Sequence, residues 1–396
     1  MTGEGENMVD RQVIRVLHVV HAFQTGGAER VVLDLTLFSN PTIVNYVCSL
    51  SEPHDLVSQL DLATTEFVSL KKRPGNDLRI VCDLARLIDE KRVDVVHAQG
   101  WGTLVEALIS AKWYARRRPA FIFAFHGKSM AEVSHVIPRR RRAAQRIAHL
   151  FTDGCIVPAS HMADDYAQTV GLSREKIDVI YNGVDVKKFG RAICPTAREV
   201  LGISKSDFVV GFVGRFDAVK DIQGIVKIFA RVRESLSNDS RIARLLFVGD
   251  GEEKQVAERL ASDLGIREYV VFAGLRSDVP RCLAAMDVYL QPSHYEGHSI
   301  SILEAMATGL PIISTRVGGT PEIVCHGHSG FLFIPGEYDL MASAILDLYR
   351  HPGLCAAMGS AGRERVTEHF SVATMVAQYE NLYHRLLGIA ERPCVV

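Results

Sequence analysis

Two glutamates stand eight positions apart in a segment whose residue types suit hydroxyl and phosphate ligands. Glu296 precedes a glycine-containing loop, and Glu304 falls on or beside the apolar face of the helix that the loop opens. An unpaired ionised carboxylate costs several kcal/mol to bury, so a glutamate in this position is expected to have hydroxyl or amide donors as partners. A ribose diol would supply two such donors. The alternative is an exposed glutamate on the polar side of the helix.

Two glycine-containing turns place backbone amides where they can bind anions. Residues Gly297, His298, Ser299 and Ile300 present consecutive amides at a predicted helix N-terminus, where the helix dipole favours phosphate oxygens. Gly26 and Gly27 stand between the first strand and the next helix, so the backbone there can approach an anion closely. A tight turn without a ligand is the alternative for this second site.

A basic pair follows the first strand of the second half of the chain. Arg215 offers a planar fork of donors and Lys220 a mobile ammonium, a combination suited to a diphosphate whose charge grows as it leaves. Structural ion pairs with Asp217 or Asp221 are the alternative interpretation. The position at a strand end favours the ligand, because parallel sheets bind ligands there.

Alternating apolar runs and helix-period segments predict an α/β fold of two Rossmann-like parallel sheets, facing each other across a ligand-binding cleft. The first series of candidate strands is Val13 to Val20, Val44 to Leu50, Glu66 to Leu70, Val93 to Ala98, Ala120 to Phe125, Gly154 to Val157 and Lys176 to Ile180. The second is Phe208 to Val213, Arg244 to Val248, Val270 to Phe272, Val288 to Gln291, Pro311 to Ser314 and Gly330 to Phe333. Helices are expected between them, for example Ala28 to Phe38 and Leu78 to Glu90.

The segment from Tyr181 to Thr196 lacks periodicity and is the predicted linker. We therefore expect a first domain at residues 1–190, a second at 191–371 and a final helical segment at 372–396. The apolar stripe of that last helix needs a partner surface, which the first domain can offer.

Composition excludes several classes of protein. The chain has 396 residues, 47% of them hydrophobic, and a net charge of −1, which fits two globular domains and argues against a nucleic-acid partner. The eight cysteines lie at least 30 positions apart and are expected to be reduced packing residues. No leader or membrane-spanning helix is predicted, so we expect a cytoplasmic location.

The motifs together resemble the retaining glycosyltransferases of family GT4, which have the GT-B fold. The resemblance lies in the two glutamates with the following Ala305 to Pro311, in Gly318 to Glu322, and in Tyr181 to Asp185, Gly214 to Phe216 and Val248 to Gly251. These motifs occur in the family's order and span nearly the whole chain. Each of them alone would be weak.

The resemblance implies roles for individual residues. Arg215 and Lys220 would bind the donor diphosphate, Glu304 the ribose, and Glu296 the hydroxyls of the donor sugar. The amides from Gly297 to Ile300 complete the phosphate site, and Gly26 and Gly27 lie against donor phosphate and acceptor. The segment Gly274, Leu275 and Arg276 is expected to meet the nucleotide base.

Three further residues stand at strand ends of the first domain. His126, before Gly127, matches the family's active-site histidine, although a lone histidine is more often a packing residue. His97 and Gln99, which end another strand, are candidates for the acceptor pocket.

The implied activity is transfer of a hexosyl unit from a nucleotide diphosphate sugar to a sugar or lipid-linked saccharide, with retention, in the synthesis of surface polysaccharide or glycoconjugate. UDP is the first expectation for the donor nucleotide and GDP the second. No Asp-x-Asp motif or ligand cluster occurs, so neither a catalytic metal nor a cofactor is expected. The alternatives are an inactive nucleotide-sugar-binding scaffold and a two-carboxylate glycoside hydrolase.

A strongly basic stretch interrupts the otherwise balanced charge. Ten basic residues and one acidic residue lie between Lys112 and Arg146. A helix opened by Pro138 would carry Arg139, Arg140, Arg141, Arg142 and Arg146 on or near one side. Such a surface suits peripheral attachment to an anionic membrane, and a solvated helix face is the alternative.

Overall fold

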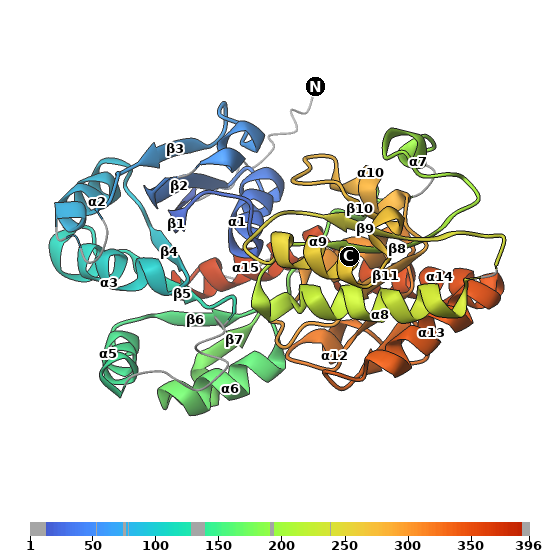
Figure 1. Cartoon of the computed structure of the whole chain (residues 1–396). Helices are drawn as coiled ribbons and strands as arrows, with labels where there is room; N and C mark the ends of the chain where they lie inside the picture. Colours follow the sequence, from blue (N-terminus) through green and yellow to red (C-terminus); the bar gives the residue numbers. More distant parts are fainter. Residues whose placement is uncertain are drawn as a thin grey trace, which may run out of the picture.

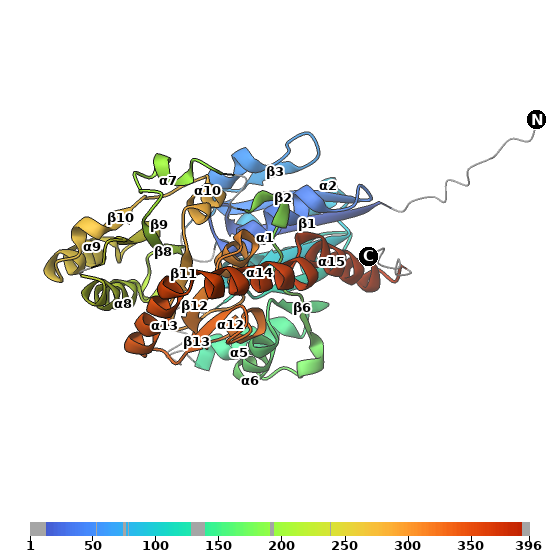
Figure 2. The same cartoon turned by 90° about the vertical axis from the view of Figure 1, so that its right-hand side faces the viewer.

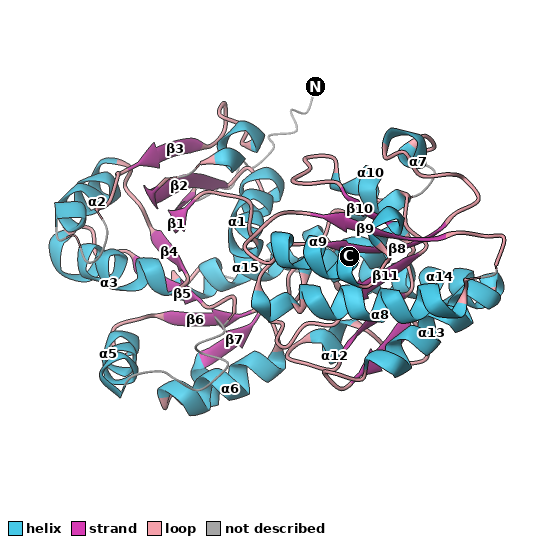
Figure 3. Cartoon of the chain, in the orientation of Figure 1, coloured by secondary structure: helices cyan, strands magenta, loops and turns pink. Residues whose placement is uncertain are grey.

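The chain folds into two domains, each built on a parallel β-sheet with helices on both faces (Figures 1 and 3). The computed structural model describes residues 13–389 except 53, 74–76, 78, 128–138, 191–193 and 238, and it describes only the backbone of 139–141. The α/β, two-sheet architecture predicted from the sequence is confirmed.

The first sheet has seven strands in the order β3-β2-β1-β4-β5-β6-β7. These are β1 (Ile14–Ala22), β2 (Ile43–Ser51), β3 (Glu66–Ser69), β4 (Val95–Gln99), β5 (Ala120–Ala124), β6 (Gly154–Val157) and β7 (Ile177–Val179). The helices are α1 (Gly27–Phe38), α2 (Arg79–Glu90), α3 (Trp101–Ile109), α5 (Arg139–His149) and α6 (Ser160–Val170). A π-helical turn, Ser110–Tyr114, continues α3.

The second sheet has six strands in the order β10-β9-β8-β11-β12-β13. These are β8 (Phe208–Val213), β9 (Ala243–Val248), β10 (Val270–Phe272), β11 (Val288–Gln291), β12 (Ile312–Thr315) and β13 (Gly330–Phe333). Its helices are α7 (Ala197–Val200), α8 (Ile222–Ser235), α9 (Lys254–Asp263), α10 (Val279–Ala284), α11 (Ile300–Thr308), α12 (Thr320–Ile323), α13 (Tyr338–Arg350) and α14 (Pro352–His369).

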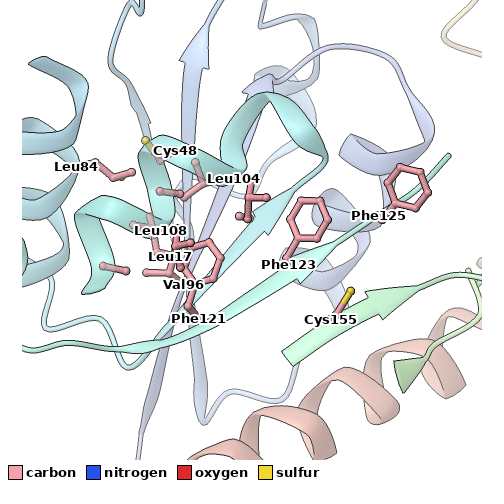
Figure 4. Packing of buried hydrophobic residues seen from close by; sticks show 14 of the residues in the cluster. Leu17, Cys48, Leu84, Val96, Leu104, Leu108, Phe121, Phe123, Phe125 and Cys155 are labelled. Atoms are coloured by element: carbon pink, nitrogen blue, oxygen red, sulfur yellow. The ribbon is translucent and has the colours of Figure 1, made fainter. Parts of the chain in front are cut away.

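The central strands of the first sheet contribute to two cores because successive side chains point to opposite faces. In β1, Leu17 and Val19 pack with α2 and α3, in the cluster that Figure 4 shows around Phe121 and Phe123. Ile14 and Val16 point to the other face and pack against α1 and the C-terminal helix. Strands buried on both faces explain the continuous apolar runs in the sequence.

The last helix, α15 (Val372–Leu386), returns to the first domain, as Figure 2 shows. Its buried Met375, Tyr379 and Tyr383 lie in the same cluster as Val16 and Val95 of the first sheet. The expected return of the C-terminal helix is therefore confirmed.

Candidate active site

The loops at the carboxyl ends of the two sheets meet at the boundary between the domains. A Cβ atom built on Gly297, after β11, would lie 2.6 Å from the carbonyl oxygen of His126, after β5. A Cβ atom on Gly27 would lie 3.9 Å from Cδ1 of Ile300 at the start of α11. The strand-end segments singled out in the sequence are thus neighbours in space.

Glu296 is held by a set of hydrogen bonds that leaves little freedom to its carboxylate. The Lys220 ammonium donates to Oε1 at 2.7 Å and to Oε2 at 2.9 Å, and Gln291 Nε2 donates to Oε1 at 2.6 Å. The Glu296 side chain is 5% exposed and that of Lys220 is 20% exposed. These hydrogen bonds hold the Glu296 carboxylate and the Lys220 ammonium side by side at the domain boundary.

Gln291 connects this carboxylate to the start of α11. Its Oε1 accepts hydrogen bonds from Tyr289 OH at 2.9 Å and from Ser301 Oγ at 3.1 Å, and its Nε2 also donates to Ser299 Oγ at 3.1 Å. Gln291 was not among the site residues predicted from the sequence. Its position as the polar last residue of an otherwise apolar, buried strand is the sequence feature that would have indicated it.

The N-terminus of α11 has amides that no described hydrogen bond uses. The hydrogen bonds of the described residues include none from the amides of Gly297 to Ile300. Ser299 occupies the N-cap position, but its hydroxyl contacts Gln291 and Ser301 instead of capping the helix. Unpaired amides at a helix start form an anion-binding arrangement.

Close backbone packing keeps this loop in place. A Cβ atom on Gly318, whose φ is +52°, would overlap the carbonyl oxygen of Glu296 at 1.6 Å. The amide of Gly319 donates to the carbonyl oxygens of Glu296 at 3.2 Å and Gly297 at 2.9 Å. Only glycine fits both the conformation and the space at position 318.

Arg215 and Lys220 have different partners. Arg215 is 75% exposed and pairs with Asp217 at 3.0 Å, so a structural ion pair does exist there. Lys220 bonds to Glu296 and not to a nearby aspartate, because Asp217 accepts from the Lys220 backbone amide and Asp221 caps α8. The exposed guanidinium of Arg215 therefore remains accessible to a ligand.

Glu304 lies half-buried in the middle of α11. No hydrogen bond to its carboxylate is found among the described residues, and burial raises its pKa to about 7 despite the nearby positive charge of Arg30. Arg30 itself pairs with Asp34 on α1. This is the carboxylate for which the sequence predicted hydroxyl partners, and the protein supplies no described donor to it.

The paired glycines lie at the start of α1 in the first domain. Gly26 is the N-cap residue, in extended conformation, and no side chain caps the helix there. Burial raises the pKa of Glu29 in the first turn, and the positive charge of Arg215 across the domain boundary opposes that increase. The Gly26 and Gly27 turn thus faces the second-domain residues expected to hold the donor.

His126 is oriented by Gln99. The two side chains share a 2.6 Å hydrogen bond between Nε2 and Oε1, so Nε2 carries the proton and Nδ1 is the acceptor. Burial lowers the pKa of His126 to about 4, which keeps the ring neutral near pH 7. Neither His126 Nδ1 nor Gln99 Nε2 has a hydrogen-bond partner among the described residues, although both atoms are buried.

The structure contradicts the acceptor role predicted for His97. Its ring is fully buried, and its Nδ1 lies 3.1 Å from the hydroxyl of Tyr383 on α15. The helix covers this part of the sheet, and Gln99 at the end of the same strand is buried as well.

The side chains of two other predicted donor-binding residues, His298 and Arg276, contact other protein residues. The His298 ring packs against Tyr181 and Phe370, each with centroids 5.2 Å away, so only its backbone can face a phosphate. Arg276 forms two hydrogen bonds to Asp278 at 2.7 and 2.8 Å.

The rest of the predicted base-contacting segment is more open. Leu275 is exposed, and the Gly274 carbonyl accepts a hydrogen bond from the Gly249 amide at 2.9 Å.

Polar contacts across the domain boundary include residues that the sequence analysis gave no site role. Glu322 accepts hydrogen bonds from the amides of Ser160 and His161 at the start of α6, both at 2.9 Å, and from Tyr181 OH. Asn182 Nδ2 donates to the His298 carbonyl at 2.8 Å. The Glu322 contacts hold α12 against the first domain, and the Asn182 contact holds the loop before α11.

The predicted membrane patch is described only in part. Arg142 and Arg146 on α5 are exposed, whereas the side chains of Arg139, Arg140 and Arg141, and Pro138 as a whole, lie outside the described residues. Within the described part of the chain, no helix is long and apolar enough to cross a membrane. No group of three metal-ligating side chains is found among the described residues.

Comparison with known proteins places both domains. Residues 195–365 match the family described as glycosyl transferases group 1, and residues 25–188 match glycosyltransferase family 4. The chain is 28% identical to the N-acetyl-alpha-D-glucosaminyl L-malate synthase of Bacillus anthracis, over 82% of this chain and 83% of that protein. It is 25% identical to an Escherichia coli galactosyltransferase acting on GlcNAc-diphosphoundecaprenol, over 93% of this chain and 96% of that protein.

A solved structure has the same fold. Anabaena HepE in complex with UDP and glucose is 23% identical, has a TM-score of 0.80, and is matched over 94% of this chain and all of that one. With both domains assigned and the two-sheet fold shared, the chain belongs to the glycosyltransferases of these two families and has the GT-B fold.

Proposed function

We propose that this glycosyltransferase transfers a hexosyl unit from a UDP-sugar, with GDP-sugar as the second choice, and that the anomeric configuration is retained. The acceptor is a sugar or a lipid-linked saccharide used in surface polysaccharide or glycoconjugate synthesis. The enzyme works without a metal and attaches peripherally to the inner face of the membrane.

One observation carries the proposal. The amides from Gly297 to Ile300 have no hydrogen-bond partner among the described residues, the Lys220 ammonium bonds to the adjoining Glu296, and the Arg215 guanidinium is exposed just after β8. A diphosphate matches this arrangement, because its oxygens accept hydrogen bonds and its charge is balanced by two cations. Glu304 lies further along the same helix, at a position suited to the ribose hydroxyls.

The residues support a mechanism in which stabilisation of the leaving group supplies most of the catalysis. The amides and the two cations stabilise the diphosphate as it departs, and the acceptor hydroxyl attacks from the same face. The leaving phosphate oxygen takes the acceptor's proton. Glu296 is engaged by Lys220 and Gln291, so it serves as an acceptor for sugar hydroxyls and not as a free nucleophile.

Neutral His126 completes the site on the side of the first domain. Its unprotonated Nδ1 accepts a hydrogen bond from a hydroxyl of the transferred sugar, and the bond from Nε2 to Gln99 fixes the orientation of the ring. A neutral ring can accept such a bond across the physiological pH range, whereas an imidazolium cannot.

The names of similar proteins support the proposed donor and acceptor classes. The Anabaena structure contains UDP and glucose, and the Escherichia coli enzyme is named for UDP-galactose and a diphosphoundecaprenol acceptor. The B. anthracis enzyme is named for an L-malate product, so the acceptor site varies among the chain's relatives.

The proposal is tested by incubating the protein with UDP-hexoses and a panel of saccharide and lipid-linked acceptors, and following the anomeric proton of the product by NMR. We expect UDP release coupled to a product with the donor's anomeric configuration. The Lys220→Met variant should carry out this transfer about a hundredfold more slowly. An inverted product, or free sugar released from a simple glycoside without nucleotide, would contradict the proposal.

A further inference from the structure

The first domain carries an apolar outer face at the ends of α3 and α5, both at the left edge of Figure 1. Ile147, Leu150 and Phe151 lie three and four positions apart, so they share one side of the helical segment, and they are 58%, 71% and 44% exposed. Trp113 and Tyr114, in the turn that continues α3, are 52% and 58% exposed. The rings of Trp113 and Phe151 meet edge to face at 4.9 Å. These five residues are called the apolar face.

The pattern of α5 differs from that of an ordinary surface helix. Its inward side carries polar groups, since Gln145 and His149 are buried and His149 Nε2 bonds to Tyr166 OH at 2.6 Å. Its outward side carries Ile147 and Leu150. Covering such a side chain is worth about 1.5–3 kcal/mol, so a grouped exposed set favours a partner over water.

Charge next to the apolar face indicates the nature of this partner. Arg142 and Arg146 are exposed on α5 beside Ile147, and Arg116 and Arg118 are exposed directly after Tyr114. The two remaining described cations of this region, Lys112 and Arg117, pair with Asp153 and Asp94. Bulky apolar side chains bordered by arginines match an anionic bilayer, whose headgroups overlie an apolar interior.

We propose that the apolar face inserts at headgroup level into an anionic membrane, with the bordering arginines on the lipid headgroups. This goes beyond attachment by charge alone, because membrane anchoring needs two signals and the structure supplies both. The role of this insertion rests on the proposed function. Because α5 and His126 belong to the same domain, insertion holds the acceptor-binding domain at the membrane surface, where a lipid-linked saccharide resides.

The test is flotation of the full-length protein with vesicles of phosphatidylcholine, with or without phosphatidylglycerol. The I147S/L150S variant removes two apolar side chains that are exposed and so leaves the core intact. We expect its binding to anionic vesicles to fall at least about tenfold, because two buried aliphatic groups are lost from the bound state. The matched control is I334S/L340S, which changes two exposed aliphatic residues of the second domain and should bind as the wild type does.

The arginines and the tryptophan give independent readouts. The R142Q/R146Q variant should bind anionic vesicles about fivefold more weakly for each arginine removed and with less dependence on salt. Trp113 fluorescence should shift to the blue on binding and be quenched by brominated lipid. Trp101 packs against Phe123 and should report no change in a Trp113→Phe variant.

Three results would overturn the inference. The first is that the wild type does not bind anionic vesicles, and the second is that the I147S/L150S variant binds them as well as the control does. The third is that the wild type is a dimer in solution and the I147S/L150S variant a monomer. UDP release from UDP-hexose, measured without vesicles, separates this inference from the proposed function. Vesicle binding without donor turnover contradicts the proposed transfer reaction and leaves the anchor standing, and donor turnover without vesicle binding contradicts membrane attachment and leaves the transfer reaction standing.

Discussion

Replacing Lys220 by methionine should separate the catalytic contribution of its charge from its contribution to stability. In the ligand-free protein the ammonium bonds to both oxygens of the nearly buried Glu296. Two unit charges 4 Å apart at an effective dielectric constant of about 20 interact by about 4 kcal/mol. Glu296 offsets part of the charge that Lys220 offers to a diphosphate. We therefore expect the substitution to remove about 2.7 kcal/mol of transition-state stabilisation, which lowers kcat/KM about a hundredfold.

The same substitution should destabilise the fold, since it leaves the Glu296 carboxylate with Gln291 as its remaining side-chain donor. Because Lys220 keeps some solvent exposure, we expect a loss of about 2 kcal/mol in the free energy of unfolding, below the range for fully buried pairs. The double variant K220M/E296Q removes both charges and should recover most of that stability, while activity stays lost.

Urea unfolding and steady-state kinetics measure the two effects. Lys91→Met is the matched control, because Lys91 also pairs with a glutamate, at 2.6 Å, and has a similar exposure of 29%. It lies in the first domain, away from the proposed donor site, and should change stability by less than about 1 kcal/mol and leave activity unaltered. The reasoning fails if Lys220→Met keeps kcat/KM within about threefold of the wild type, since the charge would then contribute little to the transition state.

Three further predictions concern charge, metal and the C-terminal helix. Because burial raises the pKa of Glu304 to about 7, the free energy of unfolding should fall by about 2 kcal/mol as pH rises from about 4.5 to 7, and UDP-sugar affinity should rise through the same range as the carboxylate ionises. Both trends should disappear in Glu304→Gln, which unfolding and calorimetric titrations at several pH values would detect. Transfer should continue at full rate in excess EDTA, and a loss restored only by a divalent ion would refute metal-free catalysis. Tyr383→Phe should lower the free energy of unfolding by about 1 to 2 kcal/mol, measured in urea, because His97 loses its partner in the core; an unchanged value would contradict that role.

The strands could be predicted because their local patterns are strong. The structure gives β6, β8, β10, β11 and β13 the predicted bounds, and it places the other strands within two residues at either end. Continuous runs of β-branched and aromatic residues between glycine-rich turns are typical of parallel strands covered on both faces. The order of strands and helices then favours a doubly wound sheet, and the fold follows from that.

The pairings within the site could not be predicted from local patterns. Lys220 and Glu296 are 76 positions apart, and the nearby aspartates were the obvious partners in the sequence. His97 and Tyr383 are 286 positions apart, so only the docking of α15 reveals that this strand end is covered. Likewise, the sequence predicted a helix with arginines on or near one side and Ile147 and Leu150 elsewhere, but not that these two side chains are exposed. Such features depend on which surfaces meet in three dimensions.

The central claim is that the domain boundary binds a nucleoside diphosphate through the amides before α11 and the cations beside them. The most direct measurement is the change in melting temperature produced by UDP, UMP and uridine at equal concentration. UDP at a hundred times its dissociation constant should stabilise the protein by about 2.7 kcal/mol, UMP by clearly less, and uridine hardly at all. Equal shifts for UDP and uridine, or none for any nucleoside diphosphate, would contradict the claim.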